Sequence, residues 1–68
     1  MADPVFQKMV FVGTSTVSFS EATAAAIAKA SQAVKGASWF EVCEQRGSIA
    51  DGKIHQYQVT VAVGYRVE

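Results

Sequence analysis

The sequence of 68 residues predicts an α+β fold, in which a three-stranded, antiparallel-type sheet partly wraps one helix. The segment 5–13 is rich in Val and Phe and ends at glycine, which indicates a strand. The segment 38–47 reads as a second strand, whose side chains divide between two faces. The segment 55–67 alternates apolar and polar residues, as a half-buried strand does. The alanine-rich segment 19–34 has high helix propensity. The predicted order is strand, helix, strand, strand in a single domain that spans residues 1–68.

The first predicted strand, Val5–Gly13, carries apolar side chains on both of its faces. One face has Val5, Met9 and Phe11, and the other has Phe6, Val10 and Val12. A strand that is apolar on both faces is usually buried on both. One helix covers only one face of a sheet, so we expect another chain to cover the second.

A polar connection, 14–17, leads into the helix. Ser18 and Glu21 fit a capping box, in which the serine caps the helix and the glutamate reaches back to the cap amide. The helix is expected to run to Val34 or Lys35, with Gly36 as its C-cap. Its predicted apolar stripe consists of Phe19, Ala26, Ile27, Ala30 and Val34. These mostly small side chains let the helix lie close to a sheet, but they bury little area.

The second strand, Ser38–Gly47, and the last strand, His55–Val67, are joined by the segment 48–54, which contains the turn signal Asp51-Gly52. A right-handed crossover through the helix makes the first and second strands parallel. The hairpin makes the last strand antiparallel to its neighbour. With this longest strand in the middle, the sheet order is 1-3-2, and its residues 55, 57, 59, 61, 63, 65 and 67 face the helix.

Trp39, the only tryptophan, is predicted to lie on the sheet face that points away from the helix. Alternation puts Phe40 and Val42 on the helix side, with Glu44 and Arg46 continuing there. The opposite, outer side receives Trp39, Glu41, Cys43 and Gln45 from this strand, and Gln56, Gln58, Thr60 and Arg66 from the last one. An indole on a polar sheet face indicates a partner chain or a flat ligand.

Trp39 and Gln58 suit the recognition of a flat heterocycle. An indole offers a stacking surface, and a carboxamide offers a donor beside an acceptor. Alternation alone favours subunit packing, because tryptophan is common at interfaces, and it keeps ligand binding as the alternative.

Composition excludes several classes of function. The formal net charge is zero, which argues against binding of nucleic acid or an anionic membrane. Cys43 is the only cysteine, so no internal disulfide or zinc site is expected, and the expected compartment is the reducing cytoplasm. No signal peptide, membrane span or nucleophile motif stands out, and His55 is the only histidine, so we do not expect an enzyme. A core this small usually needs oligomerisation, and we expect a homo-oligomer.

Over nearly its whole length the chain resembles the dodecin family. The resemblance rests on pieces that come in the family's order and spacing: Val12-Gly13-Thr14-Ser15, Ser18 with Glu21-Ala22, Trp39-Phe40-Glu41-Val42, Arg46-Gly47 with Ile49, Gly52, Tyr57-Gln58-Val59 and 63–68. Residues 1–4 and Phe11 depart from the typical pattern. The resemblance implies twelve copies that form a hollow shell and bind flavins in pairs between subunits.

The resemblance also implies roles for four residues. Trp39 would stack on the flavin and Gln58 would bind its ring edge, for FMN or riboflavin. Arg46 and Arg66 would contact a phosphate or form salt bridges between subunits, and the two roles remain equally open. Coenzyme A is a further ligand associated with bacterial members. The implied role is storage and buffering of flavin, with the indole quenching its photochemistry. The alternative is an oligomeric shell, or a coenzyme A-binding protein, without a flavin role.

Overall fold

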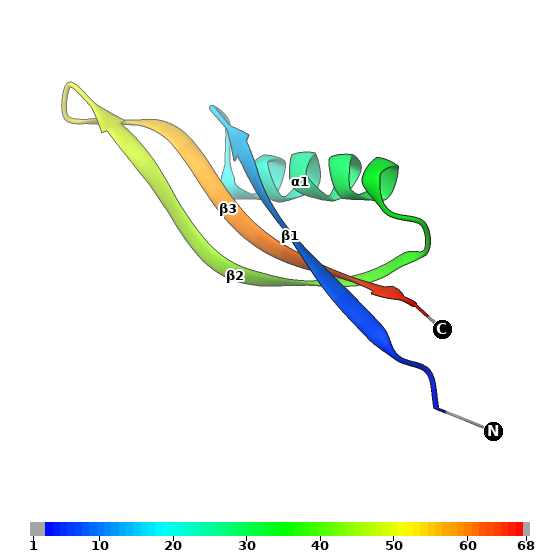
Figure 1. Cartoon of the computed structure of the whole chain (residues 1–68). Coiled ribbons are helices and arrows are strands. Elements are labelled where there is room, and N and C mark those ends of the chain that lie inside the picture. The colour runs from blue at the N-terminus through cyan, green and yellow to red at the C-terminus, as the bar shows by residue number, and fades with distance from the viewer. Residues whose placement is uncertain (1–2, 68) are drawn as a thin grey trace.

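The computed structural model describes residues 3–67 and contains one helix and three strands (Figure 1). Strand β1 spans Phe6–Ser15, helix α1 spans Phe19–Ala33, strand β2 spans Ala37–Ala50 and strand β3 spans Lys53–Arg66. The predicted order of elements is confirmed. The strands are longer than predicted toward the hairpin and at the end of β1, because backbone pairing continues through residues 48–50, 53–54 and 14–15. Met1, Ala2 and Glu68 lie outside the described residues, although the sequence analysis considered them when it described the family resemblance.

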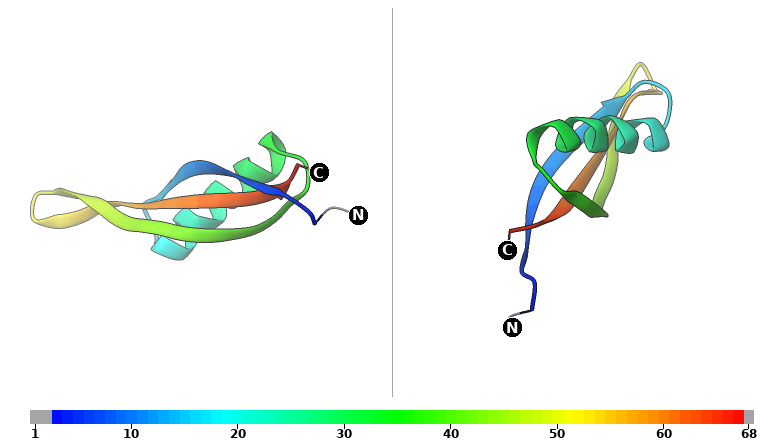
Figure 2. Two further views of the ribbon diagram at one scale, coloured as in Figure 1. Left: turned by 60° about the horizontal axis from the view of Figure 1, so that its bottom comes forward. Right: turned by 90° about the vertical axis from the view of Figure 1, so that its right-hand side faces the viewer.

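The sheet has the predicted order β1-β3-β2, with β3 in the middle and antiparallel to both neighbours. It curves past α1, which lies on one of its faces, and the β2–β3 hairpin extends well beyond the helix (Figures 1 and 2). The described chain is accordingly elongated, with extents of 58 × 19 × 13 Å. One sheet face therefore has no cover from this chain, and the hairpin end has cover on neither face.

The hairpin turns at Asp51 and Gly52, as the sequence predicts. Both residues have positive φ angles, 54° and 74°. This is the backbone of a type I′ turn, whose twist matches that of the flanking strands and which favours the Asp-Gly pair. The turn fixes the register at the start of the β2–β3 hairpin, and irregularities farther along β2 then shift it.

The caps of α1 differ from the prediction at two points. Ser18 Oγ accepts from the Glu21 N–H at 3.0 Å, which confirms the N-cap, but the Ser18 N–H donates to Ser15 Oγ at 3.4 Å rather than to Glu21. At the other end, Val34 is the C-cap and not Gly36. The Val34 N–H donates to the carbonyl of Ala30 at 2.9 Å. Gly36, with φ 75°, instead provides the bend into β2.

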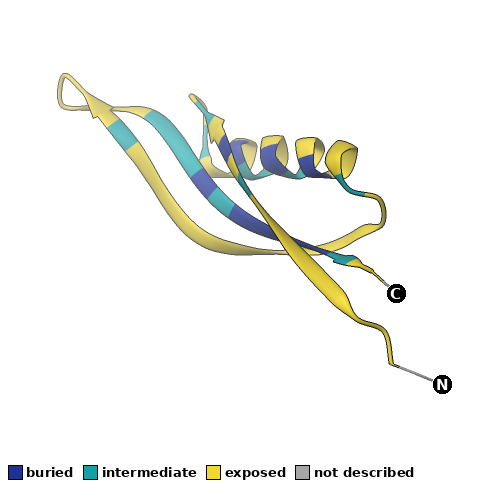
Figure 3. Cartoon of the chain, in the orientation of Figure 1, coloured by how far each residue is buried: buried dark blue, intermediate teal, exposed yellow. Residues whose placement is uncertain are grey.

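The core lies between α1 and the middle of β3 (Figure 3). It consists of Ala22, Ala26 and Ala30 from the helix and Val59, Val61 and Val63 from the strand. The predicted stripe omitted Ala22 and included Phe19, which is 36% exposed. Only two large side chains of the described residues, Val59 and Val61, are fully buried. This small core agrees with the expectation that the protomer needs further burial from other copies.

A bulge in β2 overturns part of the predicted face assignment. Val42 pairs with Val61 and Glu44 with Thr60, so Cys43 is an extra residue without an opposite partner. One extra residue reverses the alternation for the rest of the strand. Gln45 therefore lies on the helix side, opposite Val59, and Arg46 lies on the outer side, opposite Gln58. Glu44, opposite Thr60, also lies on the outer side, so the sequence analysis had assigned Glu44, Gln45 and Arg46 to the wrong faces.

Candidate functional site

The candidate site is the outer face, which we define as the sheet face that points away from α1. Successive rows across β1, β3 and β2 are Lys8–Gly64–Trp39, Val10–Ala62–Glu41, Val12–Thr60–Glu44 and Thr14–Gln58–Arg46. Several apolar side chains of this face are solvent-exposed in the single chain: Phe6, Val10, Val12 and Trp39. The face therefore combines an apolar end around Trp39 with a polar end around Gln58.

Trp39 lies over the backbone of Gly64. A Cβ built at Gly64 would collide with three indole atoms, Cε2, Cζ2 and Cδ2, so the ring occupies the space above that glycine. Phe6 packs beside the indole, with ring centroids 6.2 Å apart and an interplanar angle of 52°. Trp39 keeps 43% of its surface exposed. Because one face of the indole covers the sheet, this exposed surface offers the other face for stacking.

Lys8 and Glu41 form a bridge across the middle strand beside Trp39. The Lys8 Nζ donates to Glu41 Oε1 at 2.6 Å, and both side chains remain about half exposed. The two residues belong to the outer strands β1 and β2, and the small Gly64 and Ala62 between them leave room for the bridge. The hydrogen bond to Glu41 and the charge of its carboxylate raise the pKa of Lys8 above its usual value. Lys8 therefore stays protonated, and its positive charge lies beside Trp39, paired with the carboxylate of Glu41.

Gln58 lies half-buried in a small hydrogen-bond network at the polar end. Its Oε1 accepts from Arg46 Nε at 3.1 Å, and its Nε2 donates to Gln56 Oε1 at 2.9 Å. Arg46 Nη1 also lies 3.9 Å from Glu44 Oε1, a loose and exposed ion pair. This network exists because the bulge at Cys43 brings Arg46 to the outer face.

Trp39 and Gln58 share the outer face, as the alternation predicts, but they do not meet within one chain. Trp39 pairs with Gly64, which is six residues from Gln58 along β3 (64 − 58 = 6). Because a strand rises about 3.3 Å per residue, the two rows lie about 20 Å apart. One flat ring cannot touch both residues of the same chain.

The two candidate arginines lie at opposite ends of the face. Arg46 lies at the Gln58 end, and Arg66, which pairs with Phe6, lies beyond Trp39 at the other end. The sequence analysis had not singled out Gly64, Phe6 or Lys8 for the site. Alternation along β1 already places Phe6 and Lys8 on one face, but only the pairing of β1 with β3 shows that this is the face of Trp39.

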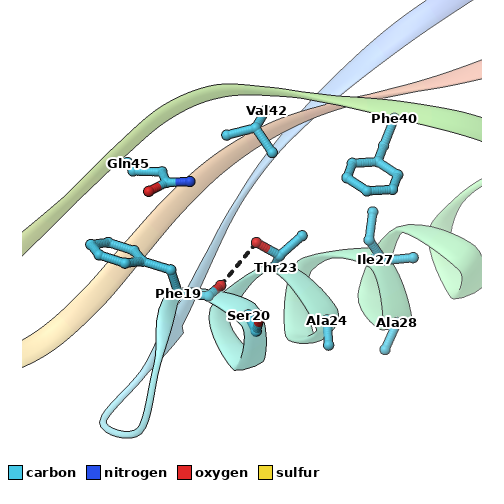
Figure 4. Close-up of a pocket in the computed structure, with 9 residues that line it drawn as sticks. All are labelled: Phe19, Ser20, Thr23, Ala24, Ile27, Ala28, Phe40, Val42 and Gln45. Carbon is cyan, nitrogen blue, oxygen red and sulfur yellow. Dashed lines mark hydrogen bonds between the residues drawn. The ribbon is translucent and has the colours of Figure 1, made fainter.

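A groove lies between α1 and β2, on the sheet face that α1 covers (Figure 4). Because α1 packs mainly over β1 and β3, it leaves Phe40 and Val42 of β2 half-exposed. The resulting groove, of about 650 Å³, is mostly apolar and is lined by Phe19, Ser20, Thr23, Ala24, Ile27, Ala28, Phe40, Val42 and Gln45. Figure 4 shows the hydrogen bond that Thr23 Oγ1 donates to the carbonyl of Phe19 at 2.9 Å, and this bond lies within the helix.

Residues 3–67 contain no group of three or more His, Cys, Asp or Glu side chains that could hold a metal ion. No helix within the same range meets the length and hydropathy that a membrane span requires. The fold and the outer face define a class of protein: a small protein with a β-α-β-β protomer and an open sheet face on which a tryptophan is exposed.

Comparisons with known proteins identify the family within this class. A family model described as Dodecin matches residues 5–68. The dodecin of Thermus thermophilus is 41% identical over 64 residues, which cover 94% of this chain and 93% of that protein. A crystal structure of a Thermus thermophilus protein matches with a TM-score of 0.89 and 39% identity over 97% of both chains. The dodecin from Streptomyces davaonensis matches with a TM-score of 0.90 and 37% identity over 98% of both chains.

The chain therefore belongs to the dodecin family. Members of this family are small oligomeric proteins that bind ligands and are generally not enzymes. The fold deduced from the sequence, with sheet order 1-3-2 and one helix, is the fold of the matching dodecin structures.

Proposed function

We propose that this protein binds flavin, as FMN or riboflavin, and stores it without turnover. The observation that carries the proposal is the position of Trp39, whose indole lies over Gly64 and keeps 43% of its surface exposed on the outer face. That arrangement suits a planar aromatic ligand. An indole in contact with a flavin also quenches its excited state, so binding protects the stored flavin from its own photochemistry.

The flavin site is composite and needs two copies of the chain. Trp39 and Gln58 lie about 20 Å apart on one outer face, so a ring that contacts both takes them from different protomers. In an isologous two-fold contact each surface patch meets its counterpart twice. Two outer faces packed in opposite directions place the Trp39 end of each over the Gln58 end of the other. This pairing creates two equivalent flavin sites and covers the exposed apolar residues of β1.

Assembly into a hollow homododecamer in the cytoplasm completes the proposal. The small core, the exposed Phe40 and Val42 in the groove, and the exposed Ile49 and Ile54 of the hairpin leave apolar surface for contacts beyond the two-fold pair. Arg46 and Arg66 carry the charge for an FMN phosphate, and the same groups suit the phosphates of coenzyme A. The second candidate function is an oligomeric shell, with or without coenzyme A, in which Trp39 serves only to pack subunits.

A titration distinguishes these functions. Ligand-stripped protein is added to dilute FMN while flavin fluorescence is followed, and the oligomer size is measured on the same sample. We expect strong quenching that saturates at one flavin per protomer. An intact large oligomer that quenches nothing would contradict the flavin role, and coenzyme A would then be the ligand to titrate.

Replacing Gln58 weakens flavin binding moderately. Gln58→Ala removes a neutral hydrogen-bonding group from the ring edge, and we expect a loss of about 0.5–1.5 kcal/mol in binding free energy. The same fluorescence titration measures it, with oligomer size as the control for assembly. A loss larger than that caused by Trp39→Ala would show that hydrogen bonding, and not stacking, dominates the affinity.

A further inference from the structure

The Gln58 carboxamide is held at both of its polar atoms. Its oxygen accepts from Arg46 Nε at 3.1 Å, and its nitrogen donates to Gln56 Oε1 at 2.9 Å. A guanidinium has only donors, so the amide atom that faces Arg46 has to be the oxygen. The nitrogen then lies on the side of Gln56, which must present its own oxygen. Arg46 thus determines the orientation of the Gln58 carboxamide.

The network leaves part of the carboxamide available. An amide oxygen has two lone pairs and an amide nitrogen has two hydrogens, and the network uses one of each. Arg46 lies directly opposite Gln58 on β2, whereas Gln56 lies two residues away along β3. The amide oxygen, which keeps one acceptor site, therefore lies on the β2 side of the group, and the nitrogen, which keeps one hydrogen, lies on the hairpin side. A ligand that binds the carboxamide therefore finds an acceptor on the β2 side and a donor on the hairpin side.

We propose that Arg46 and Gln56 are positioning residues, which orient the Gln58 carboxamide so that the site selects a planar heterocycle with an N–H beside a C=O. This inference rests on the proposed flavin function. It adds a further residue, Gln56, and a defined orientation of the Gln58 carboxamide toward the ligand. The isoalloxazine ring presents such an edge at N3–H and its neighbouring carbonyl groups. The N3–H donates to Gln58 Oε1, and the carbonyl on the hairpin side accepts from Nε2. A ring with a substituted N3 lacks the donor and is rejected.

The charge of Arg46 does not conflict with a positioning role. Its Nη1 lies 3.9 Å from Glu44 Oε1, so a carboxylate lies close to the guanidinium while its Nε holds Gln58. The bulge at Cys43 is what puts Arg46 and Glu44 on this face. Gln56 is half-buried, and its amide has no other role in the fold among the described contacts.

The test compares riboflavin with 3-methylriboflavin, whose N3–H is replaced by a methyl group. Both are titrated into the intact assembly of the unchanged protein and of Gln56→Leu, Gln56→Glu and Gln58→Ala. Gln45→Leu is the matched control, since Gln45 is a glutamine of the neighbouring strand that lies on the helix side. Oligomer size is checked for each variant.

We expect the unchanged protein and the control to bind riboflavin at least about ten-fold more tightly than 3-methylriboflavin. Gln56→Leu should weaken riboflavin binding about three- to ten-fold and lower this preference, since the amide loses one of its two restraints. Gln56→Glu keeps an acceptor and should retain both values, and Gln58→Ala should abolish the preference. If Gln56→Leu matches the unchanged protein in both values, the positioning role is wrong while the flavin function stands. If the unchanged protein binds neither flavin, the proposed function itself fails, and this inference with it.

Discussion

Gly13→Ala is expected to lower the free energy of unfolding by about 3 kcal/mol or more, at the upper end of what overpacking a tight contact costs. An added Cβ at Gly13 would collide with the backbone oxygen of Ala22 and approach Ala26 N and Cβ at 2.9 Å. The main obstacle is helix backbone, so no side-chain rotation relieves it. The helix has to move away from β1, and the alanine contacts that make up much of the core would be lost with it.

Denaturant unfolding at a fixed protomer concentration measures this effect, because the stability of an assembly depends on concentration. Lys29→Ala is the control: Lys29 is exposed on α1 and lies outside both the outer face and the groove, so its change should stay within about 0.5 kcal/mol. Gly13 does not have a positive φ angle, which removes backbone strain as a competing explanation. A Gly13→Ala protein that unfolds at the same denaturant concentration as the unchanged one would show that the helix can shift without cost.

Local patterns predicted most of the fold. The alternation along β3, the alanine-rich helix and the Asp51-Gly52 turn each depend on near neighbours in the sequence, and together they determine the order and direction of the strands. They also placed Trp39 on the correct face, since it precedes the bulge at Cys43. These elements were predictable because each one has its own periodicity or turn chemistry.

The composition of the polar end was not predictable in the same way. Gln45 and Arg46 are both polar, so no apolar residue marks the point where the bulge at Cys43 reverses the alternation. The roles of Gly13 and Gly64 have a related cause. A glycine carries no periodic signal, and its function as space for a helix or an indole follows from contacts between elements that are far apart in the sequence.

The second large effect concerns flavin binding and depends on the pair Trp39 and Gly64. Trp39→Ala should weaken flavin binding by about 1–3 kcal/mol, the range for stacking of a base on an aromatic side chain. Fluorescence titration of an intact oligomer measures it, with Trp39→Phe as the variant that keeps a smaller ring. Unchanged affinity after Trp39→Ala would refute the stacking role and favour the packing function of the indole.

Gly64→Ala tests whether flavin affinity depends on the position of the indole over Gly64 as well as on the presence of the indole. The new methyl group would occupy the space in which the ring lies, and Gly64 does not have a positive φ angle, so the displaced indole is the main consequence. We expect Gly64→Ala to cost nearly as much affinity as Trp39→Ala, and to cost nothing further once Trp39 is alanine. The coupling free energy between the two positions should then approach the full effect of Trp39→Ala, about 1–3 kcal/mol. Equal losses with and without the tryptophan would mean that Gly64 contacts the ligand or the partner chain directly, because the indole would then have no share in the effect.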